Sequence, residues 1–177
     1  MISIMKILHT PNPVLQKRAK EVSAIDKTIT ELLKGMIEAL VTHKDPEGVG
    51  LAAPQVGVSQ RIFVMKPDKK SPITIYINPV ILSVGKLRAP KEEERQPLEG
   101  CLSIPKIWGI VHRGESVELE WMDEKGKSHH ETFTGFSATI IQHEIDHLDG
   151  VLFTKRVLEQ KNPLYKEKNG ELEEFEI

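Results

Sequence analysis

Apolar residues recur every three or four positions between residues 27 and 43, which predicts a helix with one buried face. The stripe consists of Ile29, Leu32, Leu33, Met36, Ile37 and Leu40. Asp26 stands just before it as the expected N-cap. A second helix is predicted over residues 137–148 and ends before Gly150, and a short one is predicted within residues 11–20.

Short apolar and β-branched runs predict strands in the rest of the chain. The expected strands cover residues 61–65, 73–77, 79–85, 117–122 and 130–133. The last two flank Asp-Glu-Lys-Gly at 123–126, which is a hairpin signal. Residues 86–97 are charged and contain two prolines, so they are expected to form a loop. Because these strands do not alternate with helices, we expect an α+β fold with antiparallel pairing.

Length and charge narrow the class of protein. The 177 residues are 39% hydrophobic, enough for one domain over residues 1–177 with a polar, acidic tail at 161–177 that ends in a strand over 172–177 or in a disordered segment. Lys and Arg number 24 against 26 Asp and Glu, which gives no footprint for nucleic acid or an anionic membrane. No secretory signal or membrane span is visible, and the single cysteine fits a reducing compartment, so we expect a soluble cytoplasmic protein.

The strongest chemical signal is the run Gln-His-Glu-Ile-Asp-His from Gln142 to His147. On a helix, His143 and His147 lie one turn apart, about 40° around the axis, so both imidazoles can reach one metal ion. Glu144 lies on the same flank and is placed to act as a general base, as in zinc hydrolases. The opposite face carries the apolar residues Ile141, Ile145 and Leu148, so the histidines are expected to face inward.

Two histidines need a third protein ligand to hold a catalytic ion. Downstream of His147 there is no further histidine, which leaves Glu159 and Glu167 as ligands for a zincin-type metallopeptidase. Upstream lies Cys101, whose thiolate would join two imidazoles in a set suited to zinc or ferrous iron. A lone cysteine ordinarily serves core packing, so residue chemistry favours Cys101 but leaves the glutamates open.

A segment rich in small residues, Gly48 to Gly57, is not a phosphate loop because it lacks Gly-Lys-Ser/Thr. Small residues pack backbone closely, so the segment suits either a tight connection into a strand or the lining of a substrate cleft. In a cleft, the Gln55 amide could donate a hydrogen bond to an oxygen that becomes negative during reaction.

Three segments, in order along the chain, closely resemble the peptide deformylase family. The family patterns are Gly-x-Gly-x-Ala-Ala-x-Gln, here at 48–55; Glu-Gly-Cys-x-Ser, here at 99–103; and Gln-His-Glu-x-Asp-His, here at 142–147. All three are present without a mismatch, and residues 7–15 also resemble the start of family members. The resemblance covers roughly residues 5–160.

The resemblance implies antiparallel sheets packed around a central metal-binding helix, with Cys101, His143 and His147 as ligands of one divalent ion. Fe²⁺ is the usual native metal in the family, and Zn²⁺ or Ni²⁺ also occupy the site. The family removes the formyl group from N-formylmethionyl peptides of newly synthesised proteins and releases formate. It also implies transient association with the ribosome, although many bacterial members end in a helix and this chain ends in an acidic tail.

The same reaction assigns roles to individual residues. Glu144 takes a proton from the attacking water and delivers it to the leaving amine. The Gln55 amide and, by resemblance, the backbone N–H of Leu102 stabilise negative charge on the formyl oxygen. Gly50 lets its backbone approach the substrate peptide as a strand partner. The expected methionine pocket consists of Val49, Phe136 and Ile140.

Charged residues near the motifs are further candidates to support the ligands. Glu99 and Arg113 are candidates to pair beneath Cys101, although both could equally be solvated charges. Asp146 lies about a third of a turn off the ligand face of its helix, so no role in orienting a ligand is assigned to it.

Overall fold

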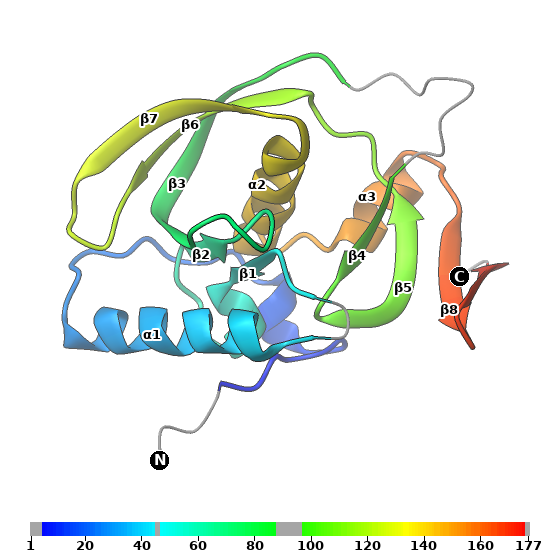
Figure 1. Ribbon diagram of the computed structural model, residues 1–177, viewed down its shortest axis with the longest axis horizontal. Helices are drawn as coiled ribbons and strands as arrows, with labels where there is room; N and C mark the ends of the chain where they lie inside the picture. The colour runs from blue at the N-terminus through cyan, green and yellow to red at the C-terminus, as the bar shows by residue number, and fades with distance from the viewer. Residues whose placement is uncertain (1–4, 45–46, 88–96, 176–177) are drawn as a thin grey trace.

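The computed structural model describes residues 5–44, 47–87 and 97–175. It confirms the α+β class, with two antiparallel sheets and the predicted metal-binding helix between strands of both (Figure 1). One sheet has the order β1-β2-β3-β6-β7 and the other β4-β5-β8-β9. The first consists of β1 Gly50–Ala52, β2 Ile62–Met65, β3 Thr74–Val84, β6 Ser116–Met122 and β7 Ser128–Thr134. The second consists of β4 Leu98–Cys101, β5 Ile104–Ile110, β8 Leu164–Lys168 and β9 Glu171–Phe175.

Both long helices form where the apolar spacing predicts them. Helix α1 spans Lys27–Thr42, and the Asp26 carboxylate caps it by accepting a hydrogen bond from the Ile29 N–H at 2.9 Å. Helix α2 spans Gly135–Leu148. A third helix, α3 Phe153–Glu159, was not predicted because seven residues are too few to show a repeating stripe. The helix expected within 11–20 is only a single 3₁₀ turn, Pro13–Gln16.

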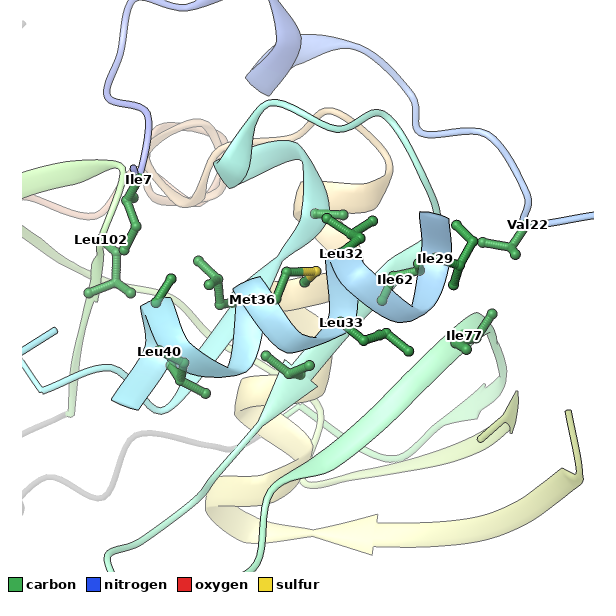
Figure 2. Close-up of a cluster of buried hydrophobic side chains, with 14 residues drawn as sticks. Ile7, Val22, Ile29, Leu32, Leu33, Met36, Leu40, Ile62, Ile77 and Leu102 are labelled. Carbon is green, nitrogen blue, oxygen red and sulfur yellow. The ribbon is translucent and has the colours of Figure 1, made fainter. Parts of the chain in front are cut away.

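The five-stranded sheet is covered on both faces, which fixes where α2 lies. In β2 all four side chains are buried and alternate between two apolar clusters. Ile62 and Val64 pack with the apolar stripe of α1. Together they form the α1 cluster, which Figure 2 shows. Phe63 and Met65 pack in the second cluster, with residues of α2. The sheet therefore separates α1 from α2 and holds α2 against its concave face (Figure 1).

The strands expected at 73–77 and 79–85 are one strand, β3, so their separation was wrong. Pro79 suggested a break, but the chain continues because Asn78 adopts a φ of 50° and the pairing with β6 shifts register between Ile77 and Val80. The hairpin around 123–126 is confirmed, and Gly126 takes a φ of 76° at its turn.

The polar tail forms a β-hairpin. Strands β8 and β9 pair in antiparallel register and extend the second sheet beside β5. The final strand expected at 172–177 is confirmed over Glu171–Phe175, and residues 176–177 lie outside the described part. Of the loop expected at 86–97, residues 88–96 also lie outside it. Among the described residues, no helix is long and apolar enough to cross a membrane.

Candidate metal centre

Three potential ligands from two elements converge in the interior. Cys101 is the last residue of β4, and His143 and His147 project from successive turns of α2. One ligand atom from each lies within 4.8 Å of the other two. The Cys101 Sγ is 3.1 Å from His147 Nε2. Backbone pairing and helix geometry thus bring together the cysteine and the two histidines that the sequence suggested.

The donor set fits a divalent transition-metal ion. A thiolate and two imidazoles are the ligands that zinc and ferrous iron accept, and three of them leave a position open for reaction. Burial opposes ionisation of Cys101, but His147 and His143 outweigh it and hold the thiol pKa well below its usual range. The thiolate is the form that binds a metal.

The zincin-type alternative is wrong for this chain. Within the described residues, the ligand cluster contains Cys101 and no downstream glutamate. Glu159 instead accepts a hydrogen bond from Arg156 at 3.3 Å, and Glu167 accepts one from Trp108 at 3.2 Å.

Glu99 contacts both the first histidine ligand and Arg113. The suspected pairing of Glu99 with Arg113 is therefore confirmed. Its Oε2 lies 3.1 Å from His143 Nδ1, so Nε2 is the nitrogen left to face an ion. Arg113 grips the same carboxylate with two hydrogen bonds, Nε to Oε1 at 2.8 Å and Nη2 to Oε2 at 2.9 Å. Burial would raise the pKa of Glu99, but the bonds from Arg113 and His143 lower it to about 2.

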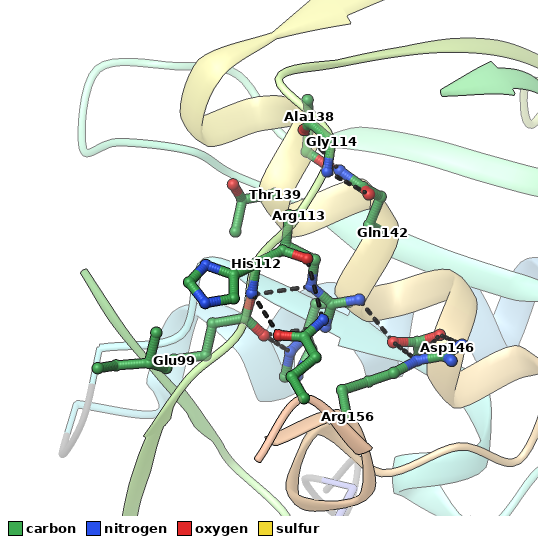
Figure 3. A network of polar contacts seen from close by, with 12 residues as sticks. Glu99, His112, Arg113, Gly114, Ala138, Thr139, Gln142, Asp146 and Arg156 are labelled. Atoms are coloured by element: carbon green, nitrogen blue, oxygen red, sulfur yellow. Dashed lines mark hydrogen bonds and ion pairs between the residues drawn. The ribbon is translucent and has the colours of Figure 1, made fainter. Parts of the chain in front are cut away.

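The ion-pair network continues through Asp146, which Figure 3 shows between two arginines. Arg113 Nη1 donates to Asp146 Oδ2 at 2.6 Å, and Arg156 Nη2 donates to Oδ1 at 2.7 Å. The carboxylate of Asp146 thus accepts hydrogen bonds from both arginines. Sequence reasoning missed Arg156, because its role depends on where the unpredicted α3 packs. The network ties α2, α3 and the strand carrying Cys101 into one unit.

Gln142, the first residue of the histidine motif, fixes the neighbouring chain. Its Oε1 accepts a hydrogen bond from the Gly114 N–H, and its Nε2 donates to the Gly114 carbonyl, both at 3.0 Å (Figure 3). This paired contact holds the segment next to Arg113 against α2.

Glu144 is buried beside the ligands with unused hydrogen-bonding capacity. Its Oε2 and the Nδ1 of His147 are buried atoms without a hydrogen-bond partner in the structure. Such atoms are costly unless a ligand or water satisfies them, so they suit a site built to receive one. Burial raises the pKa of Glu144 to about 7, although the histidines act in the opposite direction. A carboxyl with that pKa can both accept and return a proton near neutral pH.

Gln55 is held so that its amide nitrogen faces the ligands. Its Oε1 accepts a hydrogen bond from the Ala52 N–H at 2.8 Å, which fixes the orientation of the amide. Its Nε2 then points to the Ser103 Oγ at 3.2 Å and the Cys101 Sγ at 3.5 Å. The buried side chain therefore presents a donor next to the metal centre.

The remaining candidates lie around this centre in different environments. Leu102 follows Cys101 in the turn after β4, and its side chain packs in the α1 cluster, which leaves only its backbone for the site. Ile140 is buried in the cluster between α2 and the sheet, and Val49 packs against the same cluster. Phe136, in the first turn of α2, is 57% exposed.

Comparisons with known proteins agree with this geometry. The sequence model of the polypeptide deformylase family matches residues 4–163. A peptide deformylase of Dehalococcoides mccartyi is 41% identical over 165 residues, which cover 93% of this chain and 92% of that protein.

Solved structures match the fold as well. The actinonin complex of a peptide deformylase from Synechococcus elongatus matches with a TM-score of 0.77 at 36% identity, over 89% of this chain and 83% of that one. A Met-Ala-Ser-bound deformylase from Acinetobacter baumannii matches with a TM-score of 0.76 at 30% identity, over 89% of this chain and all (100%) of that one. With three sequence segments, a buried thiolate–bis-histidine cluster and a fold in common, this chain belongs to the polypeptide deformylase family.

Proposed function

We propose that Glu144, Gln55 and Leu102 are the residues with which this peptide deformylase removes the formyl group from an N-terminal formylmethionine. The observation that carries the proposal is the buried Glu144 carboxyl, which has an unpartnered oxygen and lies beside Cys101, His143 and His147. A divalent ion bound by these three ligands would supply Lewis acidity to the attacking water and the formyl oxygen. Glu144 accepts the water proton and passes it to the amine, which leaves as formate is released.

The formyl oxygen becomes negative as water adds to the formyl carbon, and it needs hydrogen-bond donors at that stage. The Gln55 Nε2 group is one donor, because the Ala52 N–H holds the amide in place before substrate arrives. The backbone N–H of Leu102, next to Cys101 in the β4–β5 turn, is the second. Losing one such donor typically costs about 3 kcal/mol of transition-state stabilisation.

The substrate peptide is proposed to add to the free edge of β1 at Gly50. This strand is the outermost of its sheet in the described part of the chain, so its edge is available for an extended peptide. The Met-Ala-Ser ligand of the Acinetobacter relative supports a peptide that begins with methionine. Val49, Ile140 and the exposed ring of Phe136 are proposed to surround the methionine side chain.

The native metal and the cellular location are inferred from ligand chemistry. One thiolate and two imidazoles accept Fe²⁺, Zn²⁺ and Ni²⁺, and we propose Fe²⁺ as the native ion on the resemblance to the family. A ligand thiolate at Cys101 must stay reduced to bind it, which favours the cytoplasm.

Contact with the ribosome is proposed to be transient. Strand β9 exposes Glu171, Glu173 and Glu174, and acidic side chains are repelled by RNA phosphates. The chain therefore meets its nascent substrates without an electrostatic anchor at this hairpin.

Residues 1–177 are proposed to act as one catalytic domain. Two residues that are adjacent in the sequence pack in different apolar clusters and so connect them. Leu102 packs in the α1 cluster, while Cys101 packs with Phe153, Val157 and Leu164.

The experiment measures formate release from matched formyl-Met and acetyl-Met peptides after anaerobic purification and metal analysis. We expect one divalent ion per chain and rapid turnover of the formyl peptide only, because an acetyl methyl must fit where formyl carries hydrogen. Equal rates on both peptides, or activity without a bound ion, would contradict the proposal.

A further inference from the structure

The C-terminal β-hairpin lies beyond the family match, which ends at residue 163. Its strand β8 nevertheless pairs with β5, the neighbour of β4, and its Leu164 lies in one apolar cluster with Cys101. We propose that this hairpin positions the metal-ligand strand, through Trp108 of β5, which Glu167 of β8 holds over Gly100. The proposal deepens the assigned function and rests on Cys101 being a metal ligand. Figure 1 shows β8 beside β5, with β4 on the other side of β5.

Trp108 covers the backbone immediately before the cysteine ligand. It is the antiparallel partner of Gly100 across the β4–β5 pair. A methyl group at Gly100 would lie 2.7 Å from Cζ3 and 2.8 Å from Cε3 of the indole, so the six-membered ring rests on the glycine backbone. Only glycine permits this approach. The register of β4 shifts between Gly100 and Cys101, so the ring lies against the irregular point of the strand.

Glu167 fixes the indole in that position. Its Oε2 accepts a hydrogen bond from Trp108 Nε1 at 3.2 Å. Tyr165 is the strand partner of Trp108, and Glu167 lies two residues further along β8, on the same face of the sheet. A hydrogen bond to a carboxylate is stronger than a neutral one, which suits a contact that must hold a large ring.

The hairpin also supports β4 from the opposite face. Cys101 belongs to an apolar cluster with Phe153, Val157 and Leu164, and Phe175 of β9 packs against it. Gly109, the neighbour of Trp108, allows close packing there, because a methyl group on it would lie 2.6 Å from Val157 and 3.1 Å from Leu164. The strand that ends in Cys101 is thus enclosed between α3 and Leu164 on one side and Trp108 on the other.

The test uses substitutions that alter the Trp108–Glu167 contact without removing the hairpin. Glu167→Ala removes the acceptor, Glu167→Gln keeps an acceptor oxygen, and Trp108→Phe keeps a six-membered ring without the N–H. Glu174→Ala is the matched control, because Glu174 is an exposed carboxylate of the same hairpin, on β9 opposite Tyr165. Two quantities are measured besides turnover: the rate at which Ellman's reagent modifies Cys101 in metal-free protein, and the affinity for Co²⁺ with its thiolate charge-transfer band. Cys101 is the only cysteine, so the thiol signal is unambiguous.

We expect Glu167→Ala and Trp108→Phe each to raise the modification rate and weaken Co²⁺ binding by about fivefold, the factor for one lost hydrogen bond. The double variant should resemble either single one. Glu167→Gln, which keeps a weaker, neutral acceptor, should lie between Glu167→Ala and the unaltered protein, and Glu174→Ala should resemble the unaltered protein. Unchanged thiol reactivity and Co²⁺ affinity in Glu167→Ala, or a fall in turnover alone, would overturn the proposal. If Co²⁺ fails to protect Cys101 in the unaltered protein, the ligand assignment is wrong, which is a separate result.

Discussion

The α-carbon of Gly50 faces the Glu144 carboxylate so closely that a methyl group there would lie 2.3 Å from Oε1 and 2.8 Å from Cδ. No side chain fits at these distances unless Glu144 moves. The glycine therefore serves two purposes, since it opens the β1 edge to a peptide and leaves room for the carboxyl group that handles the proton.

Gly50→Ala is expected to displace Glu144 and to lower kcat by about a hundredfold, the cost of misplacing a reacting group by roughly 1 Å. The bound metal should be retained, because the three atoms nearest to the added methyl group all belong to Glu144, which is not one of the three ligands. Steady-state kinetics with metal analysis provide the measurement. In a Glu144→Asp background the shorter side chain leaves space, so the added methyl should destabilise the protein less there. An equal loss of stability in both backgrounds would show that the crowding lies elsewhere.

Glu144→Gln keeps the size of the side chain and removes its basicity. Metal stoichiometry should stay almost unchanged, and kcat should fall by about a hundredfold or more. Metal analysis and formate release on the same preparation distinguish a base from a ligand. A variant that loses its metal but keeps its activity per bound ion would make Glu144 a ligand instead.

Gln55→Glu keeps the oxygen that accepts the Ala52 N–H and removes the donors that face the site. We expect kcat to fall by about 10²-fold with a smaller change in KM, because the interaction strengthens only as the formyl oxygen becomes negative. Gln55→Ala should show a loss at least as large. Ser103→Ala, which removes one partner of the same amide, is the control and should have a much smaller effect. An unchanged kcat in both Gln55 variants would assign the residue to the scaffold.

The lowered pKa of Glu99 predicts a pH-dependent contribution to stability. Its folded-state pKa of about 2 lies below the usual 4.5, so the contribution is complete above about pH 4.5 and is lost as pH falls toward 2. The shift corresponds to about 3 kcal/mol at neutral pH. The free energy of unfolding in urea is measured for the metal-free protein and for its metal-free Glu99→Gln variant. The difference between the two should become steadily smaller below about pH 4.5. A difference that is constant with pH would mean that Glu99 titrates normally.

The sequence was most informative where local spacing determines structure. The stripe and the Asp26 cap predicted α1, and the spacing of His143 and His147 predicted that both face one point. The choice of Cys101 over downstream glutamates needed the family resemblance, because residue chemistry alone left both open. Contacts between distant segments were not predictable in this way.

Three features show why the rest was missed. Helix α3 is too short for its periodicity to be seen, and so the Arg156–Asp146 pair could not be foreseen. Pro79 predicted the end of a strand. The strand continues past Pro79 because Asn78 adopts a positive φ and the pairing with β6 shifts register there. Strand β8 carries polar residues on both of its faces, so its sequence lacks the alternation of apolar and polar residues that predicts a half-buried strand.

The ion-pair network of Glu99, Arg113, Asp146 and Arg156 limits how the sequence can change over evolution. Its two carboxylates and two guanidiniums balance, and three of the four side chains are at most 10% exposed. Replacing one partner of a buried pair leaves a charge uncompensated, at a cost of about 3–5 kcal/mol, whereas replacing a whole pair by apolar residues can be neutral. Viable descendants should therefore acquire substitutions at these positions two at a time, and a lineage that has altered Arg113 should also have altered the acidic residues it binds.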